Sequence, residues 1–354
     1  MLDDATPPTD APGHSLLLAD HTTIHLGGPA KNLVWAQNQA DLIEAVSTAD
    51  ADGTPVLVLG GGSNVVIADA GFDGLVVRVA YRGVAFPEKA GEQAGEQVVM
   101  QAAAGEIWDD VVKASLARGL AGLECLSGIP GLAGATPIQN VGAYGTEISQ
   151  LVIEVPVFDR VDRRHLILSP DDCRFGYRTS ALKGDDRYLA LGVKLGLTRS
   201  ETSQPVRYQQ LADALGVELG GRAAALDVRA AVLALRAAKG MLIDPADPDS
   251  VSVGSFFTNP VLREADVPAG APRWPGADGR VKTSAAWLIE QAGFQRGFGD
   301  GRVGLSAKHT LALVNRGGAT TAELIAFATR IRDGVAQRFG VTLDVEPALV
   351  GVRL

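Results

Sequence analysis

Four small residues, Gly60, Gly61, Gly62 and Ser63, directly follow the apolar run Val56–Leu59, which is typical of a buried strand. Glycine tolerates positive φ angles, so such a turn can point several backbone N–H groups into one concavity that suits a diphosphate. A tight hairpin is the alternative. The turn is no Rossmann fingerprint, because Val65 occupies the third glycine position, and it lacks the Gly-Lys-Ser/Thr of a P-loop.

A second glycine-rich tract covers residues 119–145, GLAGLECLSGIPGLAGATPIQNVGAYG. It has too little side-chain bulk for an ordinary core strand and too many apolar residues for an ordinary exposed loop. A flat group such as an isoalloxazine ring would suit this surface. The alternative is a long irregular loop that packs on its own domain, although such loops are uncommon unless they are functional.

Several polar residues stand in unusual surroundings, but none identifies an enzyme singly. Ser255 lies in GSFFTNP, where aromatic residues could seal a site and Asn259 could donate to a ligand. Arg178 lies in FGYRTS, and Glu346 lies near the C-terminus. Each is more often structural, and Lys239 is explained by the dipole of the helix that it ends.

The elements that must position these residues alternate between short strands and helices. Residues 32–35, 56–59, 65–68 and 75–79 predict strands, and residues 39–51 predict the helix of a β-α-β unit. Residues 81–197 predict mostly strands with a helix over 107–118, and a further helix is predicted over 227–239. After a Pro/Asp-rich segment, 244–250, we expect a strand at 255–257, a helix over 284–292 and a helix from a Thr320/Glu323 capping box to 339.

Composition limits the class of protein. A length of 354 residues with 46% hydrophobic residues predicts two or three domains, and 42 glycines favour an α+β fold. A net charge of -9 argues against nucleic acid or an anionic membrane as a partner. Two cysteines without C-x-x-C spacing predict neither disulfide nor metal site. The absence of a signal peptide or membrane-helix pattern predicts a cytoplasmic protein without membrane insertion.

Six ordered segments together resemble the UDP-N-acetylenolpyruvoylglucosamine reductase family: LGGGSNVV, GIPG with PIQNVGAYG, CRFGYRTS, GSFFTNPV, AAWLIEQAGF and the terminal Val-Glu-Pro. The likeness covers about residues 20–351. It implies an α+β protein with an FAD-binding fold of the vanillyl-alcohol-oxidase type in two α/β domains. The expected parts are a disordered tail (1–14), a first FAD-binding part (15–80, joined by a strand near 344–354), a second part (81–240) and a UDP-sugar-binding domain (241–343).

The resemblance also implies roles for individual residues. It assigns Ser255 as proton donor, Arg178 as active-site arginine and Glu346 as catalytic glutamate, with Asp344 as the alternative to Glu346. The implied residues around non-covalent FAD are Gly60, Gly61, Gly62, Ser63, Asn64, Val65, Ile129, Pro130, Gly131, Ala135, Thr136, Gln139, Asn140, Gly142, Ala143 and Tyr144. The implied substrate residues are Tyr144, Tyr177, Tyr208, Lys239, Asn259, Trp274 and His309, with Tyr208 in VRYQQL as the substrate-covering tyrosine of the longer subtype.

The implied reaction consists of two half-reactions that use the same binding space in the protein. NADPH reduces FAD and leaves, and the UDP-N-acetylglucosamine enolpyruvate then receives hydride at C3 and a proton from Ser255 at C2. We expect a monomer with no metal. Two rivals remain at this point: a flavin oxidase of the same architecture, and a non-catalytic flavin or UDP-sugar binding protein.

Overall fold

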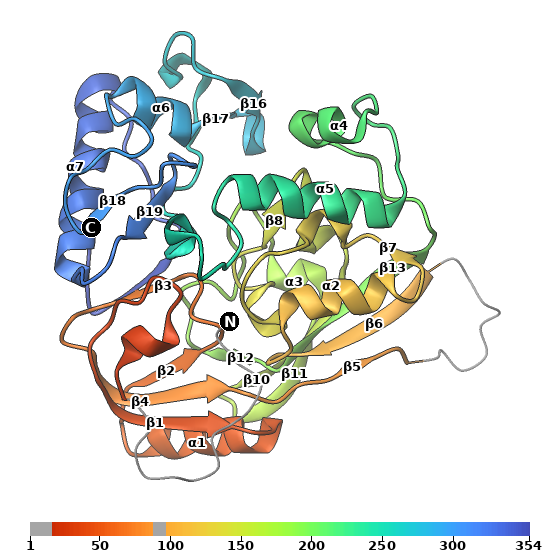
Figure 1. Cartoon of the computed structure of the whole chain (residues 1–354). Helices are drawn as coiled ribbons and strands as arrows, with labels where there is room; N and C mark the ends of the chain where they lie inside the picture. Colours follow the sequence, from red (N-terminus) through yellow and green to blue (C-terminus); the bar gives the residue numbers. More distant parts are fainter. Residues whose placement is uncertain (1–15, 88–96) are drawn as a thin grey trace.

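The computed structural model describes residues 16–87 and 97–354, and Figure 1 shows their arrangement. The tail expected over residues 1–14 lies outside the described residues. The chain forms several small sheets with helices packed against them, an α+β arrangement. Its short 3-10 helices are η1 (Leu18–His21), η2 (Glu124–Leu126), η3 (Ala133–Ala135), η4 (Ile148–Gln150), η5 (Pro248–Ser250), η6 (Glu264–Asp266) and η7 (Ala277–Gly279).

The first sheet is parallel and follows the expected β-α-β unit. Its strands, in spatial order, are β1 (Ala30–Ala36), β4 (Phe72–Val79) and β2 (Val56–Leu59). Helix α1 (Gln39–Ala51) has the predicted bounds and lies beside β1 at the bottom of Figure 1. The side chain of Asn38 caps α1 by accepting a hydrogen bond from the Asp41 N–H, 2.9 Å away. The glycine turn leaves β2 at the edge of this sheet.

The second part is an antiparallel sheet with helices on it. Its strands are β11 (Arg164–Leu168), β10 (Val152–Asp159), β13 (Gly192–Arg199), β6 (Gln97–Ala103) and β5 (Val84–Ala85), with β12 (Tyr188–Ala190) on β10 and β7 (Leu120–Ala121) on β13. Its helices are α2 (Trp108–Leu116), α3 (Pro170–Cys173), α4 (Gln209–Leu215) and α5 (Ala225–Ala238). The predicted helices at 107–118 and 227–239 are confirmed within two residues at each end. The glycine tract carries the hairpin β8 (Gly142–Ala143) and β9 (Thr146–Glu147).

The third part holds two small antiparallel sheets and two helices. They are β14 (Ser252–Ser255), β19 (Ala312–Asn315) and β18 (Val303–Leu305); β15 (Val261–Leu262), β17 (Val281–Thr283) and β16 (Arg273–Pro275); and α6 (Ala285–Gln291) and α7 (Thr321–Phe339). The capping box is confirmed, since Thr320 accepts from the Glu323 N–H and Glu323 accepts from the Thr320 N–H. The strand predicted at 255–257 is wrong: β14 ends at Ser255, and the next two residues, both Phe, are fully buried.

Several contacts join the C-terminal part to the first sheet region. Strand β20 (Ala348–Val350) pairs in parallel with β3 (Val65–Ile67), the strand that follows the glycine turn. The carboxylate of Asp69 accepts hydrogen bonds from the first N–H groups of α7, those of Thr321 (2.7 Å) and Ala322 (2.9 Å). Together with the bond from the Thr23 hydroxyl to the Ser252 carbonyl (2.6 Å), these contacts tie the region of the glycine turn to β14, which carries Ser255, and to the segment before β20, which carries Glu346.

Candidate active site

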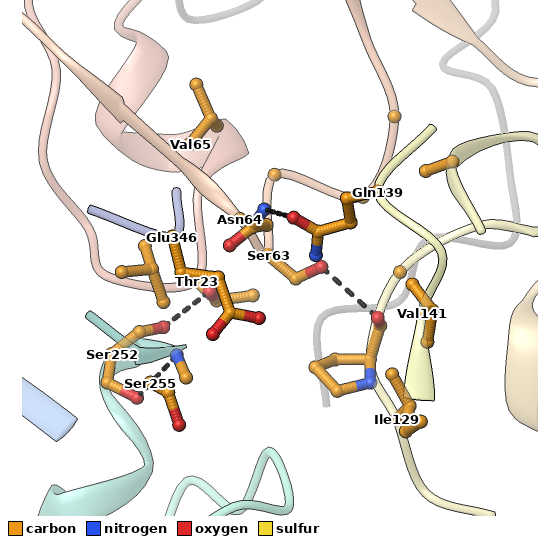
Figure 2. A pocket seen from close by; sticks show the side chains of 18 of the residues that line it. Thr23, Ser63, Asn64, Val65, Ile129, Gln139, Val141, Ser252, Ser255 and Glu346 are labelled. Atoms are coloured by element: carbon orange, nitrogen blue, oxygen red, sulfur yellow. Dashed lines mark hydrogen bonds between the residues drawn. The ribbon is translucent and has the colours of Figure 1, made fainter. Parts of the chain in front are cut away.

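A cavity of about 530 Å³ opens where the three parts meet. Its volume is in the usual range for a small-molecule site. In the view of Figure 2, Ser255 and Glu346 lie on one side of it, and Ile129 and Gln139 lie on the other. The sequence-predicted residues that line it are Gly60, Gly61, Gly62, Ser63, Asn64, Val65, Ile129, Pro130, Gly131, Ala135, Thr136, Gln139, Gly142, Ala143, Tyr144, Arg178, Tyr208, Lys239, Ser255, His309 and Glu346.

The turn after β2 is held by its carbonyl groups. Buried Arg78 donates to the Gly60 carbonyl, and the Thr23 N–H donates to the Gly62 carbonyl at 3.1 Å. Because C=O and N–H of a trans peptide point in opposite directions, the next N–H groups, those of Gly61 and Ser63, point away from these donors. This geometry suits an anionic ligand on the cavity side.

The two glycine-rich segments touch each other across the cavity wall. A Cβ on Gly61 would lie 2.9 Å from the Gly131 Cα, and a Cβ on Gly131, where φ is +110°, would lie 2.8 Å from the Ser63 Oγ. Ser63 donates to the Pro130 carbonyl at 3.2 Å, and Asn64 donates to Gln139 at 2.7 Å (Figure 2). The close backbone approach leaves a smooth wall with few protruding side chains, which fits a flat ring and a diphosphate.

Arg178 enters the cavity from a tight turn. The backbone groups of Gly176 and Thr179 bond to each other, and Arg178 has a φ of +53°, where glycine is favoured. Its Nε donates to the Glu346 Oε1 at 3.0 Å, and its Nη2 donates to the Gly142 carbonyl at 2.6 Å. The ion pair is largely shielded, with the two side chains 20% and 15% exposed.

Glu346 reaches this arginine because its segment runs beside the residues that follow β14. The Glu346 N–H donates to the Phe256 carbonyl at 2.9 Å, and the Thr258 N–H donates to the Asp344 carbonyl at 2.9 Å. Glu346 lines the cavity, whereas Asp344 is exposed and does not. Burial raises the pKa of the Glu346 carboxyl, and the positive charges of Arg178 and Lys183 oppose that rise.

Ser255 is positioned by an irregularity in β14. Ser252 pairs with Val314 and Ser255 pairs with Ala312, so β14 has one residue more than its partner strand between these pairs. Gly254 has a φ of +75° at this β-bulge. Bulges re-aim side chains beside active sites, and here Ser255 faces the cavity.

Aromatic rings and cations gather at another end of the cavity. The rings of Tyr144 and Tyr208 meet edge to face at 5.4 Å, and the Lys239 Nζ lies 5.6 Å and 5.9 Å from their centroids. The pKa of Lys239 is lowered mainly by burial and, to a smaller extent, by the positive charge of Arg236. Burial, followed by the charges of Lys239 and other cations, lowers the pKa of His309 to about 4, so its imidazole is neutral at pH 7.

Known proteins match this chain over nearly its full length. It is 52% identical to the UDP-N-acetylenolpyruvoylglucosamine reductase of Thermobifida fusca, over 95% of this chain and 97% of that protein. The chain belongs to the UDP-N-acetylenolpyruvoylglucosamine reductase family. The reductase of that name from Saccharopolyspora erythraea is 50% identical, with 95% of each chain covered.

Domain models and a solved structure agree with membership of this reductase family. Residues 30–162 match an FAD binding domain, and residues 245–350 match the family's C-terminal domain. The crystal structure of the Thermus caldophilus reductase gives a TM-score of 0.65 at 25% identity, over 95% of this chain and 98% of that one. The predicted α+β class with an FAD-binding domain is confirmed, and the chain is an FAD-dependent oxidoreductase.

Four of the residues that the family resemblance assigned do not line the cavity. The Asn140 side chain is used internally, donating to Glu147 and to the Gly176 carbonyl. Asn259 accepts from the Ala285 N–H through its side chain, and its own N–H donates to the Tyr177 hydroxyl. Trp274 on β16 is 46% exposed. The structure therefore brings together the arginine, serine and glutamate but leaves Asn140, Tyr177, Asn259 and Trp274 outside the cavity wall.

Other cavity residues escaped the sequence reasoning. They are Thr23, Leu57, Val58, Leu59, Lys183, Gly184, Arg236, Gly240, Met241, Leu242, Ile243, Ser250, Ser252, Val253, Gly254, Ala348 and Val350, while Leu132, Ile138 and Val141 lie in the glycine-rich tract that was predicted to face a flat ring. Arg236 carried a usable signal, because it precedes Lys239 by one helical turn, whereas Lys183 carried none at its spacing of five residues from Arg178. The others are apolar or small residues that only the fold brings together.

The described residues of this chain contain neither a metal-binding cluster of side chains nor a helix that could span a membrane. Among residues 16–87 and 97–354, no cluster of three or more His, Cys, Asp and Glu side chains could hold a metal ion. In the same residues, no helix combines the length and the apolar character that crossing a membrane requires.

Proposed function

We propose that this protein reduces UDP-N-acetylglucosamine enolpyruvate to UDP-N-acetylmuramate with NADPH, in the synthesis of peptidoglycan precursors. The names of its relatives and the FAD-binding match support the reaction class. The observation that carries the proposal is the meeting of Arg178, Glu346 and Ser255 in one cavity, from three distant parts of the chain.

The proposal assigns the FAD to the wall made by the two glycine-rich segments. The turn with Gly61 and Ser63 would hold the diphosphate, and the surface from Ile129 to Tyr144 would lie against the ring system. When bound, the flavin supplies the redox chemistry, a hydride equivalent taken from NADPH and delivered to C3 of the enolpyruvyl group. The turn contains no Cys or His for a covalent link, so we propose that FAD is held non-covalently.

The protein's own groups would complete the addition of hydrogen across the double bond. Hydride arrives at C3, negative charge grows toward C2 and the carboxylate, and the proton that Ser255 delivers to C2 balances it. The fixed guanidinium of Arg178 stabilises the carboxylate through charge-assisted hydrogen bonds, and Glu346 holds that guanidinium in place. Preorganisation matters here, because a serine hydroxyl is a weak acid and acts only when it is aligned with C2.

The nucleotide end of the substrate would lie beside the tyrosines. Lys239 and Arg236 offer positive charge to a diphosphate, and the paired rings of Tyr144 and Tyr208 offer an apolar face. We propose that Tyr208, 41% exposed at the start of α4, covers the bound UDP-sugar.

We also propose which parts of the chain bind each ligand. Residues 15–80, together with the strand near 344–354, and residues 81–240 would bind FAD, while residues 241–343 would bind the UDP-sugar. The pairing of β20 with β3 supports the first grouping.

An anaerobic stopped-flow experiment tests the proposal. NADPH should bleach the flavin absorbance, and the enolpyruvyl sugar should restore it with formation of UDP-N-acetylmuramate. Acid precipitation should release the yellow colour. Rapid recovery of the photoreduced protein in air, without response to the sugar, would instead identify an oxidase, and binding without NADPH turnover would identify a non-catalytic protein.

A further inference from the structure

Lys183 lines the active-site cavity, yet the reaction described above gives it no role. It is exposed and lies five residues after Arg178, in a loop that Ser180 fixes through a hydrogen bond from its hydroxyl to the Ile138 carbonyl. The Lys183 Nζ donates a hydrogen bond to the backbone carbonyl of Arg178, at 3.0 Å. The lysine therefore contacts the main chain of the residue whose side chain pairs with Glu346.

That main chain needs support. Arg178 occupies the left-handed region with a φ of +53°, a conformation that a residue with a Cβ adopts only under constraint. The turn has no glycine at this position, so its conformation depends on contacts around Arg178. The side chain is held by Glu346 and Gly142, and Lys183 holds the carbonyl.

The charge of Lys183 also lies close to the ion pair. Partial desolvation, and then the charge of Arg178, lower the pKa of Lys183, while the carboxylates of Glu346 and Asp344 oppose that effect. The charged or titratable groups that face Glu346 are Arg178, Lys183 and Tyr177. Lys183 is therefore one of two cations that favour the carboxylate form of Glu346 against its burial.

We propose that Lys183 is a positioning residue for sugar reduction: it fixes the backbone of Arg178 and provides a positive charge beside Glu346. The inference rests on the proposed function, because it assigns the lysine to the half-reaction with the enolpyruvyl sugar. Lys183 need not touch the reacting atoms.

The test compares three variants of the FAD-loaded protein. Lys183→Met removes both the hydrogen bond and the charge, whereas Lys183→Arg keeps a donor and a charge. Lys194→Met is the matched control, since Lys194 pairs with Glu154 at 2.6 Å on the second sheet and does not line the cavity.

We expect Lys183→Met to keep its FAD and its rate of flavin reduction by NADPH. Its reoxidation by the enolpyruvyl sugar should fall about 10-fold to 100-fold, the range that small misplacements of catalytic groups produce. Lys183→Arg should recover most of that loss, and Lys194→Met should resemble the wild type.

The pH profile separates positioning by charge from a merely structural role. Without the cation the pKa of Glu346 rises, so the acid limb of the reoxidation rate, measured over about pH 5 to 9, should move to higher pH in Lys183→Met but not in Lys183→Arg. Wild-type rates and profile in Lys183→Met, or equal slowing of both half-reactions, would overturn the inference. If the wild type itself failed to reduce the sugar, the proposed function would fail instead.

Discussion

Two ends of the cavity hold their side chains in different ways. At the arginine end, defined by Arg178, Ser255 and Glu346, the groups are fixed by a strained turn, a β-bulge and a shielded ion pair. At the tyrosine end, defined by Tyr144, Tyr208 and Lys239, the contacts are ring edges, cation–π distances of more than 5 Å and one hydrogen bond, from the Lys239 Nζ to the Gln210 Oε1 at 2.7 Å.

The difference has a functional consequence. Fixed charges and donors stabilise a transition state without reorganisation, so changes at the arginine end should affect the rate of sugar reduction. Ring contacts adapt to a ligand and contribute to its binding in both ground and transition states, so changes at the tyrosine end should affect affinity. Substitutions at Ser255, Arg178 and Tyr208 test this contrast.

The largest effect is expected for Ser255→Ala. Reduction of the flavin by NADPH needs no proton at C2 and should stay nearly normal, whereas reoxidation by the sugar should slow by about 10² to 10⁴, the usual contribution of a positioned general acid. Ser255→Cys keeps a proton in nearly the same place and should retain more activity. Stopped-flow traces of both half-reactions provide the measurement, and equal slowing of both would assign Ser255 to structure alone.

Arg178→Lys should have the next largest effect. Lysine keeps the charge but loses the planar fork that contacts both Glu346 and the Gly142 carbonyl, so sugar reduction should fall on the order of 10². Arg229→Lys is the control, because Arg229 makes a two-pronged pair with Asp109 away from the cavity. Similar losses of sugar reduction in both variants would point to stability rather than to the site.

Tyr208→Ala should weaken substrate binding about tenfold, roughly the value of one aromatic contact with the bound UDP-sugar, and leave the maximal rate of sugar reduction nearly unchanged. Tyr208→Phe keeps the ring and should lose less. Calorimetric titration with the UDP-sugar gives the affinities. Equal affinity in wild type and both variants would refute the covering role of Tyr208.

Substitution of His309 should have the smallest effect on turnover at pH 7. It should instead change how the stability of the folded protein depends on pH. The His309 folded-state pKa of about 4 lies below the unfolded value of about 6.5, so only the unfolded chain binds the proton between these values. Stability should therefore fall as pH decreases from about 6.5 to 4.

His309→Gln should lessen that loss, and His165→Gln, at an exposed position on β11, should not. Urea unfolding at several pH values measures the effect. An unchanged pH dependence in His309→Gln would show that its imidazole ionises in the folded protein.

Part of the site could be predicted because its signals are local. The glycines of the 60–63 turn and of the 119–145 tract indicate close backbone approach whatever the surroundings, and the structure brings both to one wall. The role of Lys183 could not be predicted, since its contact is with a carbonyl that faces it only in the folded turn. The strand at 255–257 was misplaced because the apolar run of two Phe residues hides the bulge at Gly254.

By itself the sequence determined the features that depend on neighbours in the chain. The bounds of α1 and the Thr320/Glu323 capping box follow from side chains that satisfy N–H groups within one helical turn. Only the tertiary structure decided that β4 lies between β1 and β2, and that Arg178 meets Glu346 across 168 positions of the chain. The physical reason is that strand order and ion pairing at such separations depend on the packing of whole elements, a free-energy balance that no short segment contains.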